Sequence, residues 1–297
     1  MNDMSIPSGA ILAKLSTKMD ELTPEQRKAA AWVLENPNAV GISSVRDVAE
    51  AADVKPNTVV RLARQAGFEG FEDFRIPFRE AIRSGPCSFP DRARWLQSLS
   101  KDGQLGALYH DMLDAAFRNI EDTFAGISEA DLRNVAKDIW TSRKVYILGV
   151  GVNHSNASNF GYLAATGMSD FHAIPRPGST AVDDLARTDH RDILIAITCK
   201  PYRAEVVKAM AVAREQGLKI VGISDSAASP VIVGADHGFV VSADTPQFFP
   251  SSVSTIALLE TLMSFVIAVA SDEIVDRVET FHKRRHQLGI YVEDDTG

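Results

Sequence analysis

Cysteine is scarce in this sequence. Only Cys87 and Cys199 occur among 297 residues, far apart and in no spacing that suits metal ligands. This absence argues against a disulfide framework and against a zinc site, and we expect neither a metal nor a cofactor. So few cysteines are typical of proteins in a reducing compartment, so we expect a cytoplasmic protein.

Long apolar runs are missing as well. The most apolar stretch, residues 256–270, is interrupted by Glu260 and is too short to span a bilayer, so we expect it to form a buried helix. The first twenty residues lack the basic start, long apolar middle and small-residue cleavage site of a signal peptide. We therefore expect no membrane among the partners of this chain.

The chain also lacks an excess of basic residues. Its formal net charge is -8, which at first argues against nucleic acid. Residues 1–83, however, carry 11 basic and 12 acidic side chains, so the remaining residues account for -7 of that charge. With 45% hydrophobic and 24% charged residues the composition is that of a globular protein, long enough for two domains.

Residues 44–74 carry the clearest local pattern. Apolar residues recur at helical spacing before and after a three-residue break at Asp53–Lys55, and the second helical pattern starts at Pro56. Ala49 is small where two helices would cross closely, and Val54 is placed to fill the turn between them. This pattern predicts a helix-turn-helix, in which the second helix enters the DNA major groove.

The polar face of the second helix suits DNA. Arginine can bond guanine through two hydrogen bonds, asparagine and glutamine can pair with adenine, and threonine can contact phosphate or a thymine methyl group. Between Val54 and Phe68 there are three basic residues and no acid, which favours DNA over the alternative of a solvated face on a structural helix pair. The residues expected to contact DNA are Ser44, Lys55, Asn57, Thr58, Arg61, Arg64 and Gln65.

Residues that cap or end helices mark the helix boundaries in the rest of the first half of the chain. Thr23 and Gln26 bracket a helix start, Ser44 and Asp47 bracket another, and Gly67 is expected to end the second helix of the pair. A further helix should run to about residue 83. We thus predict an all-α helix-turn-helix domain of four or five helices over residues 1–83, followed by a linker over residues 84–104.

The second half changes to continuous apolar runs separated by segments of helical length. Such runs are typical of a parallel sheet covered on both faces, so we predict an α/β doubly wound domain over 105–271 with a five-stranded sheet. A charged helix and tail should follow over 272–297. The expected strands are 145–148, 171–174, 193–197, 220–223 and 239–241, and the expected helices include 153–167, 203–217, a short one at 230–234 and 252–270.

Two strand-end loops could hold an anion. The glycines of Gly149–Gly151 allow a helix N-terminus to approach a ligand, but the third glycine of a dinucleotide-binding fingerprint is missing, which argues against a nicotinamide enzyme. The loop 198–203 places Lys200 and Arg203 directly before a helix. The alternative interpretation of this loop is a solvated turn with two surface charges.

Short stretches in both halves of the chain together resemble one known family. These stretches are Leu22–Gln26, Leu34–Pro37, Val48–Ala52, Thr58–Arg61, Gly67–Phe71, Phe74–Arg75, Gly149–Gly151, Ala157, Ile197–Thr198, Ile223–Ser226 and Ser229–Pro230. With them the chain, from about residue 15 to 270, resembles an RpiR/MurR-type bacterial transcriptional regulator, which joins a helix-turn-helix domain to a sugar isomerase (SIS) domain. The resemblance implies a repressor or activator that binds double-stranded operator DNA, senses a phosphosugar or related metabolite, and forms a homodimer or homotetramer.

One stretch departs from that family. Its phosphate loop resembles Ser-x-Ser-Gly-x-Thr, whereas here only Thr198 keeps a hydroxyl and Pro201, which has no amide hydrogen, replaces the flexible glycine. Lys200 and Arg203 could replace the lost contacts with charge, so the ligand stays open between a phosphosugar, a carboxylate and a non-sugar. Residues 245–252 either line the pocket or pack at a subunit interface. The expected effector-binding residues are Gly149, Gly151, Asn153, Ser155, Thr198, Lys200, Arg203, Ser251 and Ser252.

An aldose-ketose isomerase is the alternative function. It needs a carboxylate or imidazole placed to move a proton, together with several converging groups. The candidates in this sequence form no repeated, spaced pair, and the phosphate loop is weakened, so we expect a sensor with no catalytic residues. These candidates are Glu205, Glu260, His154, His172, His190 and His237.

Overall fold

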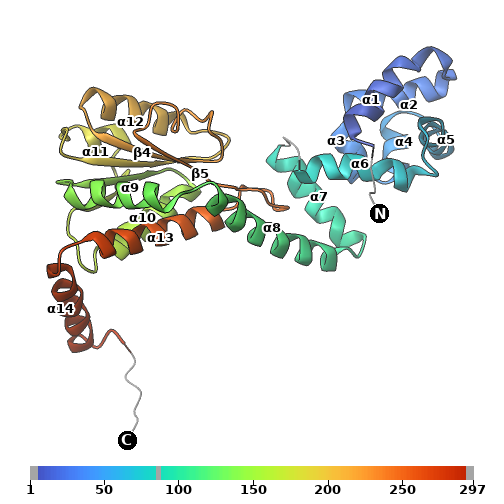
Figure 1. Cartoon of the computed structure of the whole chain (residues 1–297). Helices are drawn as coiled ribbons and strands as arrows, with labels where there is room; N and C mark the ends of the chain where they lie inside the picture. The colour runs from blue at the N-terminus through green and yellow to red at the C-terminus, as the bar shows by residue number, and fades with distance from the viewer. Residues whose placement is uncertain (1–5, 85–87, 292–297) are drawn as a thin grey trace, which may run out of the picture. The chain divides into compact units, whose positions relative to one another are not determined.

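The computed structural model describes residues 6–84 and 88–291 (Figure 1). The expectations for Cys87 and for the end of the tail therefore lie outside the described residues. The chain forms two compact units: the first comprises residues up to Ala115 together with Asp244–Phe249, and the second comprises Ala116–Ala243 and the residues from Pro250 onwards. Each unit is described by itself below.

The first unit is helical, as predicted. The pattern around Thr23 and Gln26 forms the expected capping box, and Gly67 ends its helix in the left-handed conformation at φ 104°. The expected linker contains a helix and Pro37 opens a further short one, so the helices outnumber our prediction. The helices are α1 Ser8–Thr17, a 3-10 turn Met19–Glu21, α2 Pro24–Glu35, α3 Pro37–Ile42, α4 Val45–Ala51, α5 Pro56–Ala66, α6 Phe71–Ser84 and α7 Phe89–Lys101.

A cluster of phenylalanines on α6 holds the first unit together. Phe74 and Phe78 are fully buried, and the ring of Phe74 lies 5.2 Å from that of Phe78 and 5.5 Å from that of Phe68. The same core includes Val59 and Leu62 from α5. The inner face of α5 is therefore fixed, and its outer face is held at a set angle to the rest of the unit.

The second unit has the predicted α/β fold. Helix α8 begins in the first unit and ends in the second. The elements are α8 Leu105–Ala125, α9 Glu129–Thr141, β1 Val145–Gly149, α10 Val152–Ala164, β2 Phe171–Ile174, α11 Ala181–Leu185, β3 Ile193–Ile197, α12 Ala204–Glu215, β4 Lys219–Ser224, β5 His237–Val240, α13 Val253–Val269 and α14 Glu273–Gln287.

The five strands are all parallel, in the order β2-β1-β3-β4-β5. One face packs on α9, α10 and α13, and the other packs on α11 and α12, so apolar clusters cover the sheet on both sides (Figure 1). The order reverses between β1 and β3, which are paired with Gly149 opposite Ile197. In open α/β sheets this reversal marks the crevice where ligands bind.

Two local predictions in this unit were wrong. Residues 230–234 form a turn rather than a short helix, because the Ser229 carbonyl accepts from the amides of Ile232 and Val233 and the segment closes at Gly234, with φ 85°. Helix α11 was not predicted at all, since five residues are too few to show a helical period. In the described part of the chain no single helix is long and apolar enough to cross a membrane, and only α13 and α14 together, bent by 118°, reach that length and composition.

Candidate functional site

Helices α4 and α5 form the predicted helix-turn-helix. The Ser44 hydroxyl caps α4 by accepting from the Asp47 amide at 3.3 Å, and Asp47 accepts from the Ser44 amide at 2.9 Å. Hydrogen bonding from the Ser44 side chain, and then from its amide, holds the pKa of Asp47 below its usual value. Ala49 is buried, as its small size predicts, and its carbonyl accepts from the Val54 amide at 2.9 Å. Asp53 provides the left-handed step of the turn, at φ 51°.

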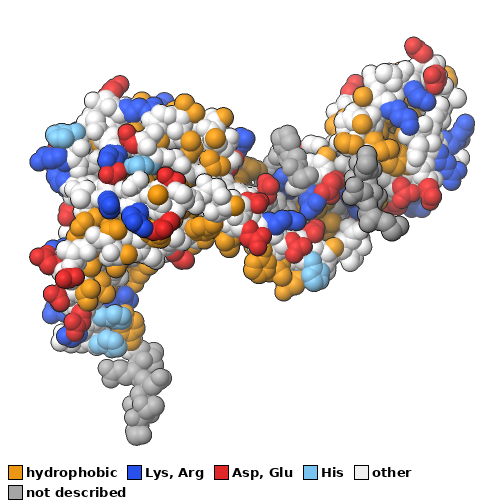
Figure 2. Space-filling model, in the orientation of Figure 1, with side chains coloured by type: hydrophobic (Ala, Val, Ile, Leu, Met, Phe, Trp, Pro, Cys, Tyr) orange, Lys and Arg blue, Asp and Glu red, His pale blue; other side chains and the backbone are white. Residues whose placement is uncertain are grey.

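The outer face of α5 presents the side chains that the sequence singled out. Lys55, Asn57, Arg61 and Gln65 are exposed and Thr58 is half-buried. Figure 2 shows Lys and Arg side chains gathered over the part of the first unit where α5 lies. Asn57, Thr58, Arg61 and Gln65 stand on one surface of α5, at the spacing with which a recognition helix reaches base edges, and Lys55 precedes the helix as its N-cap residue.

Two members of the predicted set have structural contacts of their own. Ser44 is exposed, but its hydroxyl caps α4. The Arg64 Nε donates to the Glu69 carbonyl at 3.2 Å, and this ties the loop after α5 to the helix. Both stay predictions as DNA contacts.

The sequence did not reveal what holds the far end of α5. The Lys14 Nζ, on α1, donates to the carbonyl of Ala66 at 2.6 Å, so a cation neutralises the negative end of the helix dipole. Lys14 and Ala66 are 52 residues apart in sequence, and no local pattern could link them. Arg46 on α4 is also exposed and basic, and the prediction did not include it because its basic residues came from the turn and the second helix alone.

The two anion loops of the sequence meet at the point where the strand order reverses. Gly149 ends β1 and Thr198 follows β3, which is the neighbour of β1 in the sheet. Helices α10 and α12 begin from these loops on opposite faces of the sheet. Two helix N-termini therefore flank one crevice, an arrangement that favours an anionic ligand.

The β1–α10 turn is tightly packed. A Cβ atom at Gly149 would overlap the carbonyl group of Asn153, so the strand end and the helix start approach as closely as glycine allows. Gly151 has φ 65° and opens α10. Asn153 is buried with its Oδ1 accepting from Asn156 at 3.1 Å, whereas Ser155 is exposed. Gly149 and Asn153 thus have packing roles, and their effector contacts stay predictions.

The β3–α12 loop is closed by its own hydrogen bonds. Thr198 is buried and its hydroxyl accepts from the Arg203 amide at 3.3 Å, while the Lys200 amide donates to Asp225 Oδ1 at 3.3 Å. Pro201 has no amide to offer. The side chains of Lys200 and Arg203 belong to exposed residues. The loop can therefore offer cationic side chains to a ligand, but no free amide at residues 200, 201 and 203.

Cys199 lies inside the same loop as a partly buried free cysteine. Burial raises the pKa of its thiol to about 12, and the Asp225 carboxylate acts in the same direction. At neutral pH the side chain is a protonated thiol.

The remaining predicted effector residues belong to a different strand-end loop. Ser251 and Ser252 precede α13, after β5, and β4 separates β5 from β3. The Ser251 hydroxyl accepts from the Val253 amide at 3.3 Å. These serines stay predictions, but the sheet order does not place them beside Thr198.

A third strand-end loop, after β2, is organised by a buried carboxylate. Asp184 on α11 accepts from the Arg176 amide at 2.7 Å, from Arg176 Nε at 2.8 Å and from the Ser179 hydroxyl at 2.8 Å. Burial alone would raise the pKa of Asp184, but these hydrogen bonds hold the pKa below its usual value.

We expect Asp184→Asn to lower the free energy of unfolding at pH 7 by about 2 kcal/mol, because a neutral amide replaces a charged acceptor. A carboxyl with a lowered pKa in the folded state stabilises the fold above its unfolded pKa of about 4. That contribution is lost as the pH falls through the folded pKa. The difference in urea midpoint between the wild type and Asp184→Asn should therefore narrow from pH 7 to pH 3. An equal difference at the two pH values would contradict the stabilising role of the Asp184 charge.

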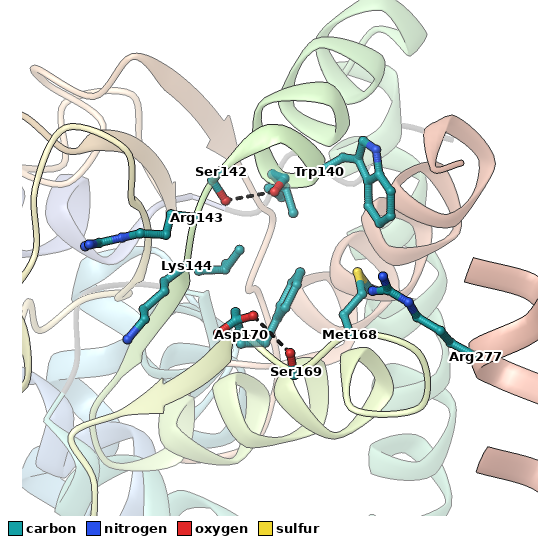
Figure 3. A pocket seen from close by; sticks show the side chains of 11 residues that line it. Trp140, Ser142, Arg143, Lys144, Met168, Ser169, Asp170 and Arg277 are labelled. Atoms are coloured by element: carbon teal, nitrogen blue, oxygen red, sulfur yellow. Dashed lines mark hydrogen bonds between the residues drawn. The ribbon is translucent and has the colours of Figure 1, made fainter. Parts of the chain in front are cut away.

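A pocket of about 180 Å³ lies at the opposite, amino-terminal edge of β1 and β2 (Figure 3). It is lined in part by Trp140, Lys144, Asp170 and Arg277. Arg143 also lines the pocket, but its guanidinium points outward and pairs with Asp192 at 2.5 Å (Figure 3). Its charged lining combines basic side chains with the single carboxylate of Asp170.

The candidate catalytic groups of an isomerase do not converge. His190 and His237 precede or begin strands and so lie at the amino-terminal edge of the sheet, and His237 pairs with Asp138 at 2.8 Å. His172 is on β2, and Glu260 is within α13. Only His154 and Glu205 lie on helices that start at the crevice. In the described residues no group of three metal-binding side chains is assembled.

Two family models match two separate parts of the chain. The helix-turn-helix domain model of the rpiR family matches residues 9–85, and the SIS domain model matches residues 138–270. An uncharacterized HTH-type transcriptional regulator of Caldanaerobacter subterraneus is 24% identical, with 94% of this chain and 97% of that protein covered. The HTH-type transcriptional regulator RpiR of Escherichia coli K12 is 21% identical, over 90% of this chain and 89% of that protein.

Two solved structures have a similar fold. The NanR protein of Vibrio vulnificus complexed with ManNAc-6P superposes with a TM-score of 0.55 at 20% identity, over 94% of this chain and 98% of that one. The sugar isomerase domain of an RpiR transcription factor from Sphaerobacter thermophilus gives a TM-score of 0.56 at 20% identity, over 59% of this chain and 98% of that one.

Proposed function

We propose that this chain, which belongs to the RpiR family of helix-turn-helix transcriptional regulators with a SIS domain, binds its operator through α5 and changes that binding when its SIS domain takes up a small anionic metabolite. DNA binding and transcriptional regulation follow from the family. The residues that contact DNA, the class of effector and the response are our proposal, as is a cytoplasmic location.

The observation that carries the DNA-binding half is the outer face of α5. Arg61, Asn57 and Gln65 are exposed together on a helix whose inner face is fully packed. No acidic residue occurs on this helix or in the turn residues Val54 and Lys55 before it. A DNA phosphate backbone would therefore meet only neutral and basic groups along this helix.

The sensing half rests on the crevice between β1 and β3. Two helix N-termini flank it, and Lys200 and Arg203 bring two positive side chains to its rim. With the amides of Lys200 and Arg203 engaged within the chain, charge rather than an amide cradle would hold the anion. A phosphosugar fits this chemistry, as does a sugar carboxylate. ManNAc-6P, the ligand in the similar Vibrio structure, is the natural first probe.

An isomerase is the less favoured function. Of the groups that could move a proton, only His154 and Glu205 lie near the crevice, and the His154 ring contacts the Gly149 carbonyl at 3.3 Å. We propose a sensor with no turnover, and phosphosugar isomerisation would be the observation against it.

Regulation would follow from a two-state dimer. A dimer can place two α5 helices in successive major grooves, about one helical turn apart. An effector shifts the population of the DNA-binding arrangement only by the difference in its affinity for the two arrangements.

Removing the positive side chains of Lys200 and Arg203 at the crevice should abolish the response to effector. For Lys200→Ala with Arg203→Ala we expect ManNAc-6P, or whichever sugar phosphate of a panel binds the wild type, to bind about 10–100-fold more weakly in calorimetry. Operator binding without effector should be unchanged.

The matched control is Arg133→Ala with Lys137→Ala. It removes the same charge from exposed positions on α9 and should bind the sugar phosphate like the wild type. If both double variants bind it equally well, the anion is held elsewhere.

A further inference from the structure

The pocket at the amino-terminal edge of β1 and β2, which we call the edge pocket, lies entirely within the second unit (Figure 3). Part of its lining is continuous with the core, since Ile139, Val145 and Met168 are buried. The half-buried rings of Trp140, at the end of α9, and Phe171, at the start of β2, add aromatic surface. A ligand in the edge pocket therefore buries apolar surface against aromatic and aliphatic side chains.

The volume of the edge pocket, about 180 Å³, suits a single small ring. An apolar cavity of about 150 Å³ holds benzene, whereas drug-sized ligands occupy about 300–1,000 Å³. One aromatic ring therefore fits, with room for a short substituent.

The two hydroxyl groups in the lining do not favour a sugar as that ring. The Ser142 hydroxyl donates to the Ile139 carbonyl at 2.8 Å, and the Ser169 hydroxyl donates to Asp170 Oδ2 at 2.9 Å. Both donors are thus used within the chain. A sugar needs several hydrogen-bond partners when it leaves water, whereas an aromatic ring needs none.

The charged part of the lining favours an anionic substituent. Arg277, on α14, lines the edge pocket, and Figure 3 shows its side chain directed towards Met168. Arg277 pairs with Glu273 at 3.3 Å, but the two side chains are 56% and 76% exposed. Exposed pairs of this kind contribute little, so a ligand carboxylate can replace Glu273 at small cost. Lys144 adds a second positive charge, and within residues 6–84 and 88–291 it pairs with no carboxylate.

Close packing fixes the place of Arg277. A Cβ atom at Gly167, in the turn after α10, would come within 2.7 Å of Ile274 Cδ1 and 3.0 Å of Val278 Cγ2, so this turn and α14 approach closely. Ile274 is itself buried and lies one helical turn before Arg277. The core therefore holds this part of α14 beside the edge pocket, and the exposed pair with Glu273 is not needed for that.

We propose that the edge pocket binds a small aromatic carboxylate, with its ring against Trp140 and Phe171 and its carboxylate accepting hydrogen bonds from the Arg277 guanidinium. Aromatic rings pack well on one another, and arginine can give a carboxylate two parallel hydrogen bonds. The crevice between β1 and β3 lies at the opposite, carboxyl edge of the sheet. The edge pocket is therefore a second ligand site, independent of the proposed effector site and of operator binding.

Titration of the full chain with benzoate tests this site by calorimetry and by tryptophan emission. We expect a Kd below about 1 mM, which is reasonable for so small a ligand. Benzamide has the ring without the charge and acetate has the charge without the ring, so each should bind at least about 10-fold more weakly. Benzoate should change the emission of Trp140, since the other two tryptophans, Trp32 and Trp95, belong to the first unit. Trp140→Phe should keep benzoate binding and lose this change.

The charge contact is tested by Arg277→Ala, which should weaken benzoate binding about 5–10-fold. This is the low end for a charged hydrogen bond, because Arg277 is half exposed. The matched control is Lys283→Ala, which removes the same charge from a side chain that is 69% exposed on the same helix and does not line the edge pocket. It should bind benzoate like the wild type. Both substitutions are at exposed positions, so folding should be unaffected.

Four results would each overturn the inference. They are no benzoate binding at millimolar concentration, equal binding by Arg277→Ala and Lys283→Ala, an emission change that persists in Trp140→Phe, and loss of benzoate binding in Lys200→Ala with Arg203→Ala, which would place benzoate in the crevice. Operator binding and the response to sugar phosphates are measured separately, so these results leave the proposed function intact.

Discussion

Gly149→Ala should lower the free energy of unfolding of the second unit by at least about 3 kcal/mol, which for a unit of this size corresponds to a fall of roughly 10 °C in melting temperature by calorimetry. The new methyl group would overlap the backbone carbonyl of Asn153. Backbone atoms cannot rotate away as a side-chain tip can, so the end of β1 and the start of α10 would have to separate.

A second glycine in the same region provides the control. Gly161 lies inside α10, where a Cβ atom would make only ordinary contacts, 3.9 Å from Ala173. Gly161→Ala should therefore stabilise the unit by about 0.5–1 kcal/mol, because alanine loses less backbone freedom in a helix. The two variants should therefore change the free energy of unfolding in opposite directions. If Gly149→Ala melts like the wild type, the close approach of β1 and α10 is not as described.

Arg61→Ala should weaken specific operator binding by about 1–3 kcal/mol, that is, roughly 5- to 150-fold, and should reduce the preference for operator over a scrambled duplex. Arg61 is exposed at the centre of the outer face of α5, where a guanidinium can reach a base edge. Anisotropy titrations at one fixed salt concentration measure both quantities, and thermal unfolding should be unchanged.

The control for this experiment is Arg94→Ala. Its side chain is 62% exposed on α7 of the same unit, and its loss changes the net charge equally. It should leave the preference for operator intact. If Arg61→Ala and Arg94→Ala weaken binding to operator and scrambled duplex alike, α5 is not the reading helix.

Local chemistry explains why most of the first unit could be predicted. Thr23 with Gln26 and Ser44 with Asp47 form capping boxes, which need only residues three apart. Gly67 ends α5 for an equally local reason. The contact between Lys14 and the end of α5 spans 52 residues, and packing alone brings these groups together.

In the second unit, too, the sequence predicted the local elements but not how they are arranged. Continuous apolar runs predicted five buried strands, but they do not specify strand order. The loops at Gly149 and Thr198 become one site only because β1 and β3 are neighbours.

The loss of free amides in the β3–α12 loop was predictable only in part. The sequence predicts the missing amide hydrogen at position 201, because proline has none. The bond from the Lys200 amide to Asp225 depends on the neighbouring strand, and the sequence carries no local sign of it.

The most direct test of the account is one titration of the full chain onto the duplex that flanks its own gene, with and without a panel of sugar phosphates that includes ManNAc-6P. We predict binding that is specific to that duplex and that shifts about 5- to 150-fold with at least one member of the panel. Equal affinity for a scrambled duplex, together with no response to any sugar phosphate, would contradict the account.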